Sequence, residues 1–312
     1  MEDGMRPGAR RARRVGGPVV WRVHLGAHKT ATTHMQRALA AKRPALRKAG
    51  VDYLPMPKVR ELGLPELHRA LAEADAPRPE RRRRLRAELD SLRRRGGAVA
   101  FSEENLLGAS RQLLGRRIYP GARRVAGFLS LLGQGENVLH LFLGVRSWDT
   151  LLPSAYAEML RRRRPLAGGF EAVRSRALAE PPRWSDLVAR LKAGAPKATL
   201  TLWRYEDYEA HAREAAGLFL GVDPGPMDEI PRPRGTATPS AEAVAEAEAL
   251  SERMPSDRRL EAVREIFTRL PAEAGVKFQP FATAERERLR EAYEEDLARI
   301  EAQWPGTVAR WD

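Results

Sequence analysis

The sequence predicts an α/β protein with a mostly parallel central sheet, helices on both faces and a helical C-terminal extension. Three observations support this class. Short apolar runs recur along the chain, most of them lead into a segment with helical spacing of apolar residues, and only helical patterns occur beyond residue 240. Strands that alternate with helices form β-α-β units, in which each helix returns the chain so that the strands run parallel.

The N-terminal part of the chain shows this alternation. The run VVWRVHL at 19–25 predicts the first strand, and a helical pattern follows over 32–49. VDYLP at 51–55 predicts a short second strand. Leucines at helical spacing over 66–95 are interrupted by APRP at 76–79, which predicts two helices.

Three further apolar runs predict strands that are covered on both faces, because polar residues do not alternate along them. They are AVAFS at 98–102, NVLHLFLGV at 137–145 and ATLTLWRYE at 198–206. Helical patterns follow the last two runs, near Asp149 and over 208–220. These elements complete the predicted sheet.

A Pro- and Gly-rich stretch over 221–239 separates the strands from two more helical patterns, about 240–270 and 281–302. We therefore expect an α/β domain over 18–230. A linker and helical extension over 231–312 are expected to pack on it.

The amino-acid composition excludes several kinds of catalytic and metal-binding site. The chain has no Cys, which excludes disulfide bridges, a cysteine nucleophile and metal sites built on thiolates. Its 55 Lys and Arg exceed its 41 Asp and Glu by 14, and 48 of the 55 are Arg. Such a surface attracts nucleic acid and small anionic substrates alike. The basic residues 1–17 lead into no apolar export signal, and we expect a disordered tail on a cytoplasmic protein without a membrane span.

The most informative segment is HLGAHKTATTHMQ at 24–36. It joins the first strand to the first helix, where ligands of open α/β sheets bind and where a helix N-terminus offers unpaired N–H groups. Gly26 permits a sharp turn and Lys29 supplies a positive charge. Three hydroxyl donors follow in the first helical turn: Thr30, Thr32 and Thr33. The pattern predicts a cradle for a phosphate-like anion; the alternative is a plain capped helix with a solvated Lys29.

The segment is not a nucleoside-triphosphatase loop, because that motif needs Gly where His28 stands. K-T-x-T-T, preceded by an apolar strand and His-x-Gly-x-His and followed by Gln36, instead resembles the 5′-phosphosulfate-binding loop of sulfotransferases that use 3′-phosphoadenosine 5′-phosphosulfate, particularly the bacterial ones. The resemblance implies a fold like that of P-loop nucleotide-binding proteins. It also implies that the donor is bound by Lys29, Thr30, Ala31, Thr32 and Thr33.

Ala31 departs from the pattern, because members of that family usually carry Gly at this position. The departure is mild if the position is helical, since Ala is the better helix former. It matters if the backbone there has a positive φ or approaches the ligand closely.

VRSWDTLLPSAY at 145–156 resembles the second half of the family's nucleotide site, in which a strand ends in Arg and a Ser follows eight residues later. The resemblance implies that Arg146 and Ser154 bind the 3′-phosphate, and a guanidinium offers a bidentate fork for it. The ordinary alternative is that Arg146 pairs with Asp149. The resemblance covers residues 18–220.

Sulfuryl transfer needs a base for the acceptor proton and cationic groups where charge builds on the bridging oxygen. Lys29 and Thr30 are candidates for the second role. In the family the base is a His or Glu at the end of a central strand, and Glu103 matches the Glu version. A strand end beside an apolar wall would raise its pKa toward working pH. Glu104 is expected to point the other way if the strand geometry persists, because side chains alternate along a strand.

Histidines and aromatic residues complete the candidates. His28 ranks second to Glu103 as the base, and His140 is expected to be a satisfied core residue. Several aromatic side chains near strand ends either stack on adenine or pack in the core: Trp148, Tyr156, Trp203 and Tyr205. RPRGTATPS at 232–240 is a linker or a lid.

The predicted function is transfer of sulfonate from 3′-phosphoadenosine 5′-phosphosulfate to a hydroxyl or amine of an unidentified acceptor, such as a carbohydrate or small metabolite, without a metal. One alternative is a metal-dependent phosphoryl transferase, since AVAFSEE also resembles a strand that ends in acidic magnesium ligands. The missing G-K-[ST] spacing disfavours it. The other alternative is a nucleic-acid binder with Arg-rich helices, which an aromatic content of 6% disfavours.

Overall fold

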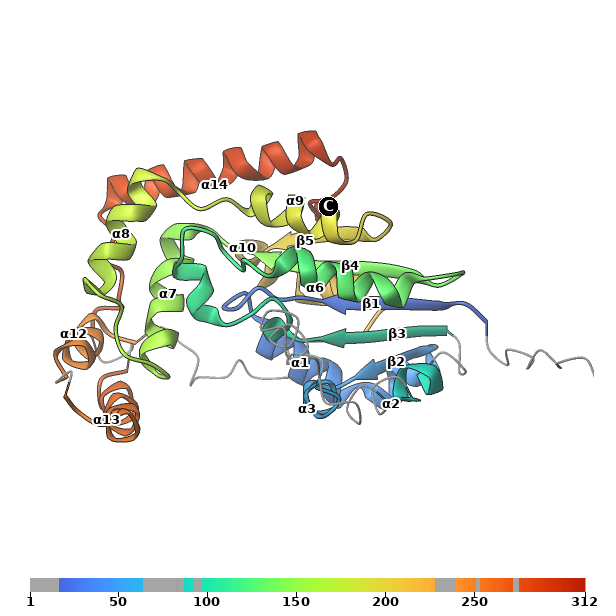
Figure 1. Cartoon of the computed structure of the whole chain (residues 1–312), viewed down its shortest axis with the longest axis horizontal. Coiled ribbons are helices and arrows are strands. Elements are labelled where there is room, and N and C mark those ends of the chain that lie inside the picture. Colours follow the sequence, from blue (N-terminus) through green and yellow to red (C-terminus); the bar gives the residue numbers. More distant parts are fainter. Residues whose placement is uncertain are drawn as a thin grey trace, which may run out of the picture.

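The computed structural model describes residues 17–63, 83, 87–92, 97–227, 239–250, 253–271 and 275–311. A layer of strands runs through the middle of the molecule, and one group of helices extends beyond the ends of the strands (Figure 1). The predicted tail, most of the helices predicted within 66–95 and the predicted boundary near residue 230 lie outside the described residues.

The sheet contains five strands in the order β2-β3-β1-β4-β5, and every neighbouring pair is parallel. The predicted α/β class is confirmed. The strands are β1 Val19–His24, β2 Val51–Leu54, β3 Gly97–Ser102, β4 Val138–Val145 and β5 Thr199–Arg204. Because β1 is central and β3 and β4 flank it, the segments that leave these three strands meet at one edge of the sheet.

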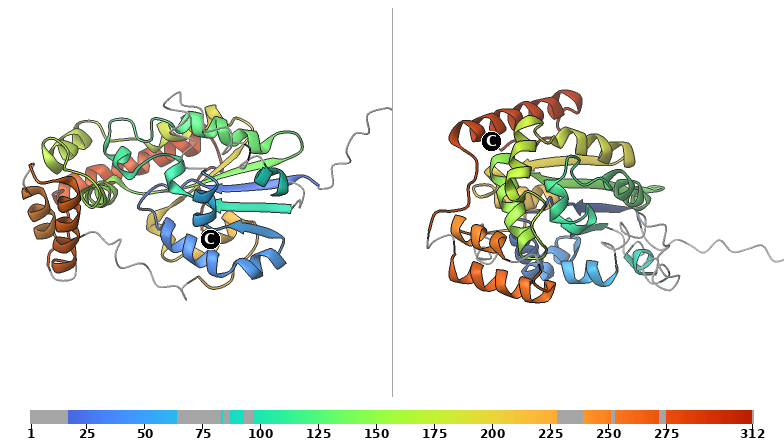
Figure 2. Two further views of the ribbon diagram at one scale, coloured as in Figure 1. Left: turned by 60° about the horizontal axis from the view of Figure 1, so that its bottom comes forward. Right: turned by 60° about the vertical axis from the view of Figure 1, so that its left-hand side comes forward.

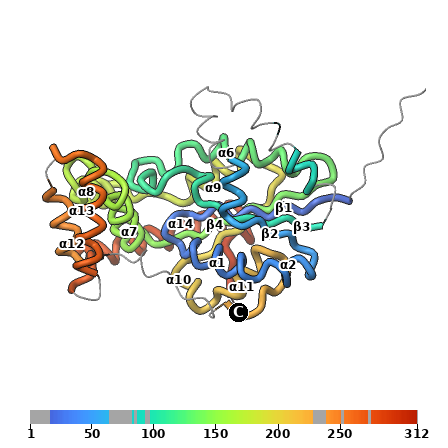
Figure 3. The backbone as a smooth tube through the Cα atoms, turned by 90° about the horizontal axis from the view of Figure 1, so that it is seen from below, coloured from blue at the N-terminus to red at the C-terminus, as the bar shows by residue number. Residues whose placement is uncertain are grey.

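Both faces of the sheet are covered. The described helices are α1 Thr32–Ala41, α2 Arg43–Lys48, α3 Met56–Glu61, α6 Ala122–Leu129, α7 Trp148–Leu160, α8 Gly169–Ala179, α9 Trp184–Gly194, α10 Tyr205–Tyr208, α11 Ala212–Leu220, α12 Ala241–Ala249, α13 Ser256–Arg269 and α14 Thr283–Gln303. Seen from below, α6 and α9 lie on one face and α1, α2 and α11 on the other (Figure 3). Trp21 and Val23 of β1 pack in the core of the first face, and Phe142 and Trp203 in that of the second.

Two predicted helices are each divided in two. The pattern over 32–49 breaks at Lys42, and Pro44 lies in the first turn of α2, where a missing N–H costs nothing. The pattern over 240–270 gives α12 and α13, and Pro255 immediately precedes α13. Pro44 explains the first break, because it cannot donate the hydrogen bond that would continue α1, and Pro255 fixes the start of α13.

The C-terminal helices contact the rest of the fold at two places. α12 and α13 pack together beside α7, whereas α14 runs along α7 and α9 (Figures 1 and 2). Within the described residues, no helix combines the length and apolarity that crossing a membrane requires.

Candidate functional site

The loop between β1 and α1 lies at the carboxyl edge of the sheet and stays attached to β4. The amide of Leu25 donates to Phe142 O at 2.8 Å, and that of Ala27 donates to Gly144 O at 3.1 Å. Gly144 leaves room for the loop, because a Cβ there would lie 2.8 Å from Thr30 Oγ1. The loop therefore depends on the strand beside it for its path.

The loop backbone presents N–H groups that have no acceptor among the residues that the structure describes. Lys29 and Ala31 have φ angles of 66° and 63°, in the left-handed region. The four amides from Thr30 to Thr33 donate no hydrogen bond to any residue that the structure describes. Left-handed residues that alternate with others and precede a helix N-terminus turn their N–H groups inward as an anion-binding nest. Ala31 thus has the positive φ at which a Gly would be less strained.

The threonines of this loop have two different roles. Thr30 Oγ1 donates to Ala27 O at 2.7 Å, and Thr32 Oγ1 donates to the same oxygen at 3.1 Å. Both hydroxyls hold the turn closed and are not presented as ligand donors. Thr33 is half-buried, and its hydroxyl has no hydrogen bond within the described part of the chain. Of the three, Thr33 is the hydroxyl ready to meet an anion.

Lys29 is buried among cations. Its side chain is 12% exposed, and Nζ lies 3.9 Å from Oε2 of Glu158 on α7. Arg161 and Arg162 contact the same carboxylate, at 3.4 and 2.9 Å. Burial lowers the pKa of Lys29 to about 8; Glu158 opposes this and the surrounding guanidinium groups, including Arg146, reinforce it. One carboxylate thus faces three cations, and the alternative of a solvated Lys29 is wrong.

Arg146 follows β4 and contacts the loop directly. Its Nη1 donates to Lys29 O at 2.9 Å, its Nε donates to Thr150 Oγ1 at 2.9 Å, and its guanidinium lies 4.1 Å from the ring centre of Tyr205. Burial lowers its pKa. Nη2 has no hydrogen bond among the described residues. The two sequence motifs, 117 residues apart at this contact, therefore meet in space.

The alternative partner of Arg146 is engaged elsewhere. Asp149 is fully buried and accepts a hydrogen bond from Ser147 Oγ, while Arg286 and Arg290 of α14 lie 3.5 and 3.1 Å from its Oδ2. Pairing of Arg146 with Asp149 is therefore wrong. Ser154 is buried on α7, two turns after the start of that helix.

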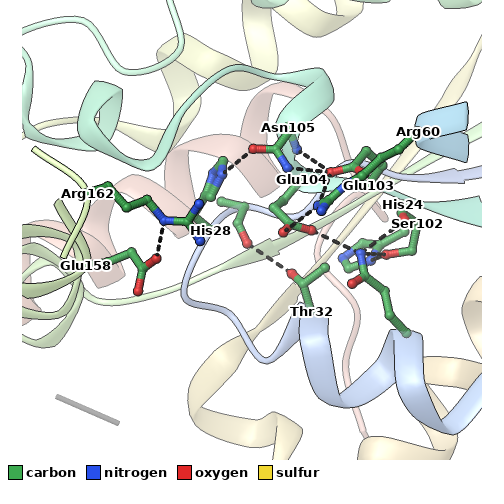
Figure 4. A network of polar contacts seen from close by, with 12 residues as sticks. His24, His28, Thr32, Arg60, Ser102, Glu103, Glu104, Asn105, Glu158 and Arg162 are labelled. Carbon is green, nitrogen blue, oxygen red and sulfur yellow. Dashed lines mark hydrogen bonds and ion pairs between the residues drawn. The ribbon is translucent and has the colours of Figure 1, made fainter. Parts of the chain in front are cut away.

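Two carboxylates follow β3, and Glu103 is completely enclosed (Figure 4). Arg60 of α3 donates to it from Nε at 2.6 Å and from Nη2 at 3.0 Å. Asn105 donates from its amide N–H at 3.0 Å and from Nδ2 at 2.7 Å. Glu103 thereby caps the 3-10 turn η1 Glu104–Leu106 and anchors α3 to the sheet.

Glu104 lies against the loop. A Cβ added to Gly26 would lie 2.8 Å from Glu104 Cβ, so the two backbones pack closely. Gln36 Nε2 donates to Glu104 Oε2 at 3.0 Å, and Arg60 Nη2 is 3.7 Å from Oε1. Burial and the charge of Glu103 raise the pKa of Glu104. Glu104 does not point away from Glu103, because the strand geometry on which that expectation depended ends at Ser102 and the 3-10 turn brings both carboxylates to Arg60.

His28 is held by two neighbours. Its Nδ1 lies 2.8 Å from Tyr119 Oη, which also accepts from the His28 backbone N–H, and its Nε2 lies 3.4 Å from Asn105 Oδ1. Because Asn105 Nδ2 donates to Glu103, Oδ1 faces the ring, and this pattern assigns the proton to Nε2. Burial lowers the pKa of His28 to about 4. The ring is neutral at neutral pH.

His140 differs from expectation. It is only half-buried, hydrogen-bonds Thr199 through Nδ1, and lines an open pocket with Arg22, Phe142 and residues of α11. The expectation of a core histidine is wrong because α11 leaves this part of the sheet uncovered. Trp148, Tyr156 and Trp203 are buried in the core, whereas Tyr205 lies under Arg146. Only residues 239 and 240 of the suggested lid are described.

Several residues of the site escaped the sequence analysis. They are Arg60, Asn105, Tyr119, Glu158, Arg161 and Arg162. No local pattern distinguishes them from ordinary surface or core residues, since each acquires its role from a contact between distant elements. Within the described residues, no group of three or more His, Asp or Glu is placed to hold a metal ion.

No protein-family model matches the chain, and no curated protein matches it. Among solved structures, the chain is similar to a sulfotransferase from Alicyclobacillus acidocaldarius, with 15% sequence identity and a TM-score of 0.43. The match covers 93% of this chain and 96% of that one. The function proposed below rests on contacts within this chain.

Proposed function

We propose that this protein is a sulfotransferase that moves a sulfonate group from 3′-phosphoadenosine 5′-phosphosulfate to a hydroxyl or amine. One observation carries the proposal: the unused amides of residues 30–33 lie beside the buried cations Lys29 and Arg146. Unsatisfied N–H groups and buried charges are costly unless an anion meets them. The amides of residues 30–33 and Nη2 of Arg146 are thus left for a negative ligand that no described residue supplies.

A nucleotide with anionic groups at two positions fits this arrangement. The amides and Lys29 form one cationic centre at the start of α1, which suits the 5′-phosphosulfate. Arg146, with its unbonded Nη2 and with Tyr205 beneath its guanidinium, forms a second centre suited to a 3′-phosphate, and Ser154 on α7 belongs to the same proposed subsite. Stacking holds the guanidinium plane in place before the ligand arrives.

The residues at the loop suggest how the reaction is assisted. Lys29 is held at the first helical turn, where its ammonium group would neutralise charge on the phosphate oxygen that leaves the sulfur. Thr33 offers a free hydroxyl at the same place. The acceptor must lose a proton, and the groups near the loop that could take it are Glu103, Glu104 and His28. The acceptor, a carbohydrate or small metabolite, and the cytoplasmic location stay predictions.

Calorimetric titration with adenosine 3′,5′-bisphosphate in the absence of magnesium tests the proposal. We expect saturable binding, and Arg146→Ala should weaken it at least tenfold because the positive charge and the unbonded Nη2 are lost. Arg213→Ala is the matched control, since Arg213 is an exposed arginine of α11 that pairs with Asp223. Absence of binding by the folded wild-type protein would overturn the proposal.

The same sample separates the alternatives. Magnesium-dependent turnover of ATP would support a phosphoryl transferase instead. DNA binding that weakens steeply with salt, without nucleotide binding, would support a nucleic-acid binder.

A further inference from the structure

The two adjacent carboxylates at the end of β3, Glu103 and Glu104, differ in how many further hydrogen bonds they can accept. Glu103 accepts four hydrogen bonds from Arg60 and Asn105 and has no exposed side-chain surface. Proton transfer to such a carboxylate would first require its two hydrogen bonds from the half-exposed Arg60 guanidinium to break. Glu103 therefore serves to position the turn that follows it.

His28 is also engaged. Nε2 carries the proton and points at Asn105, while Nδ1 accepts the hydroxyl hydrogen of Tyr119. A base must offer a free lone pair to the acceptor, and neither ring nitrogen does so. Hydrogen bonds instead connect His28 through Asn105 and Glu103 to Arg60 (Figure 4), and Tyr119 extends this chain on the other side of His28.

The carboxylate of Glu104, in contrast, can accept further hydrogen bonds. Its side chain is 17% exposed, Oε2 accepts one hydrogen bond from Gln36, and Oε1 is 3.7 Å from Arg60, beyond hydrogen-bonding distance. Gln36 is itself fixed, because its Nε2 also donates to Ser102 O at 3.0 Å. α1 thus holds the carboxylate at the loop that the proposed donor occupies.

We propose that Glu104 is the general base of the reaction, and that Gln36 and Arg60 position it. This inference rests on the proposed function. As the acceptor oxygen forms its bond to sulfur, the bond between sulfur and the bridging phosphate oxygen breaks, and its electron pair stays on the phosphate. Glu104 takes the acceptor proton, so atoms and charge balance without a metal or a redox partner.

The groups around Glu104 favour proton uptake. Glu103 faces it from the same turn, Arg60 from α3, Tyr53 from β2 and Tyr119 from the segment before α6. Burial and the neighbouring Glu103 carboxylate raise its pKa, while Arg60 and Gln36 oppose the rise. A base with a raised pKa is better matched to neutral pH than an ordinary Glu.

The experiment compares Glu104→Gln with Glu103→Gln. Release of adenosine 3′,5′-bisphosphate from 3′-phosphoadenosine 5′-phosphosulfate is measured with water as the acceptor, across pH. We expect E104Q to lower turnover about 100-fold or more and to abolish the acidic limb of the pH profile. Calorimetry should show adenosine 3′,5′-bisphosphate binding within about threefold of wild type, because the substitution spares Lys29 and Arg146.

Stability supplies a readout that does not depend on turnover. A carboxyl group whose pKa is raised by folding contributes stability only while protonated, and this is lost as pH rises through the raised value. E104Q should therefore melt at a higher temperature than wild type at pH 7.5 and at the same temperature at pH 4. E103Q should melt several degrees lower at pH 7.5, since it removes the charge of a buried carboxylate that accepts four hydrogen bonds from Arg60 and Asn105.

The outcomes separate this inference from the function itself. Wild-type turnover and binding, with E104Q retaining full activity and its acidic limb, would overturn Glu104 as the base and leave the proposed function intact. A lower melting temperature of E104Q at pH 7.5 would also contradict the inference. If the wild-type protein binds no nucleotide, the proposed function fails first.

Discussion

The loop at the start of α1 and the junction between α14 and α9 are both polar, yet their polar groups are treated in opposite ways. At the junction, Asp296 of α14 accepts from the amides of Trp184 and Ser185 at 2.6 and 3.1 Å and from the Ser185 hydroxyl. Its carboxylate satisfies the N-terminus of α9, as a capping residue does. At the loop, the amides of residues 30–33 find no acceptor in the described chain.

The difference shows which polar groups stabilise the free protein and which destabilise it. A satisfied helix N-terminus holds elements together, whereas an unsatisfied one, with two left-handed residues and crowded cations, makes the free protein less stable. A protein retains such strained and unpaired groups where a ligand binds them in the functional state. The comparison predicts that substitutions at the junction destabilise the protein and that suitable substitutions at the loop stabilise it.

The largest effect is expected for Asp296→Ala. It leaves two buried amides and one hydroxyl unpaired, and we expect a loss of about 3 kcal/mol in the free energy of unfolding. Urea denaturation measures it, and Asp296→Asn, which keeps one acceptor oxygen, should lose less. A loss below about 1 kcal/mol would show that α14 is not held by this carboxylate.

Lys29→Met should act in the opposite direction at neutral pH. Because burial lowers the pKa of Lys29 to about 8, its charged form destabilises the folded state at lower pH, and removing it should add about 1–2 kcal/mol at pH 7. The benefit should diminish between pH 8, where the folded protein begins to lose the Lys29 proton, and about 10.5, the ordinary lysine value that the unfolded chain retains. Lys48→Met, at an exposed position on α2, is the control and should change little.

The same lysine controls nucleotide affinity. Adenosine 3′,5′-bisphosphate should bind wild type about tenfold more weakly at pH 9 than at pH 7, since the ammonium group that meets the anion is lost. Calorimetry of K29M should show weak, pH-independent binding. An affinity of wild type that is flat between pH 7 and 9 would exclude Lys29 from the anion site.

The smallest effect is expected for Ala31→Gly. A left-handed Ala destabilises the folded state by about 1–2 kcal/mol, and Gly removes this strain. Because Gly also makes the unfolded chain more flexible, we expect the free energy of unfolding to rise by only about 0.5–1 kcal/mol. Ala40→Gly, within α1, should instead lose about 1 kcal/mol. Thermal melting of the pair measures both, and equal signs would contradict the left-handed geometry.

The sequence was informative where local patterns suffice. The continuous apolar run at 137–145 correctly predicted a strand, and β4 is buried from Leu141 to Val145, although Val138 is exposed and His140 is half-buried. Pro44 explains the break between α1 and α2 that hydrophobic spacing missed. The sequence was misleading where a strand ended earlier than alternation assumed. Glu104 shares Arg60 with Glu103 because the 3-10 turn replaces the pleat.

By itself the sequence determined the α/β class and the strand-loop-helix at Lys29, because both follow from the order of residue types along the chain. The candidate role of Arg146 came from the resemblance to the sulfotransferase motif. Only the tertiary structure decided which polar groups already have a partner. Arg60 and Asn105 donate all the hydrogen bonds that Glu103 accepts, and Asp149 pairs with arginines of α14. The amides of residues 30–33 have no acceptor among the described residues. Hydrogen-bond saturation and burial depend on elements far apart in the chain, so no local pattern encodes them.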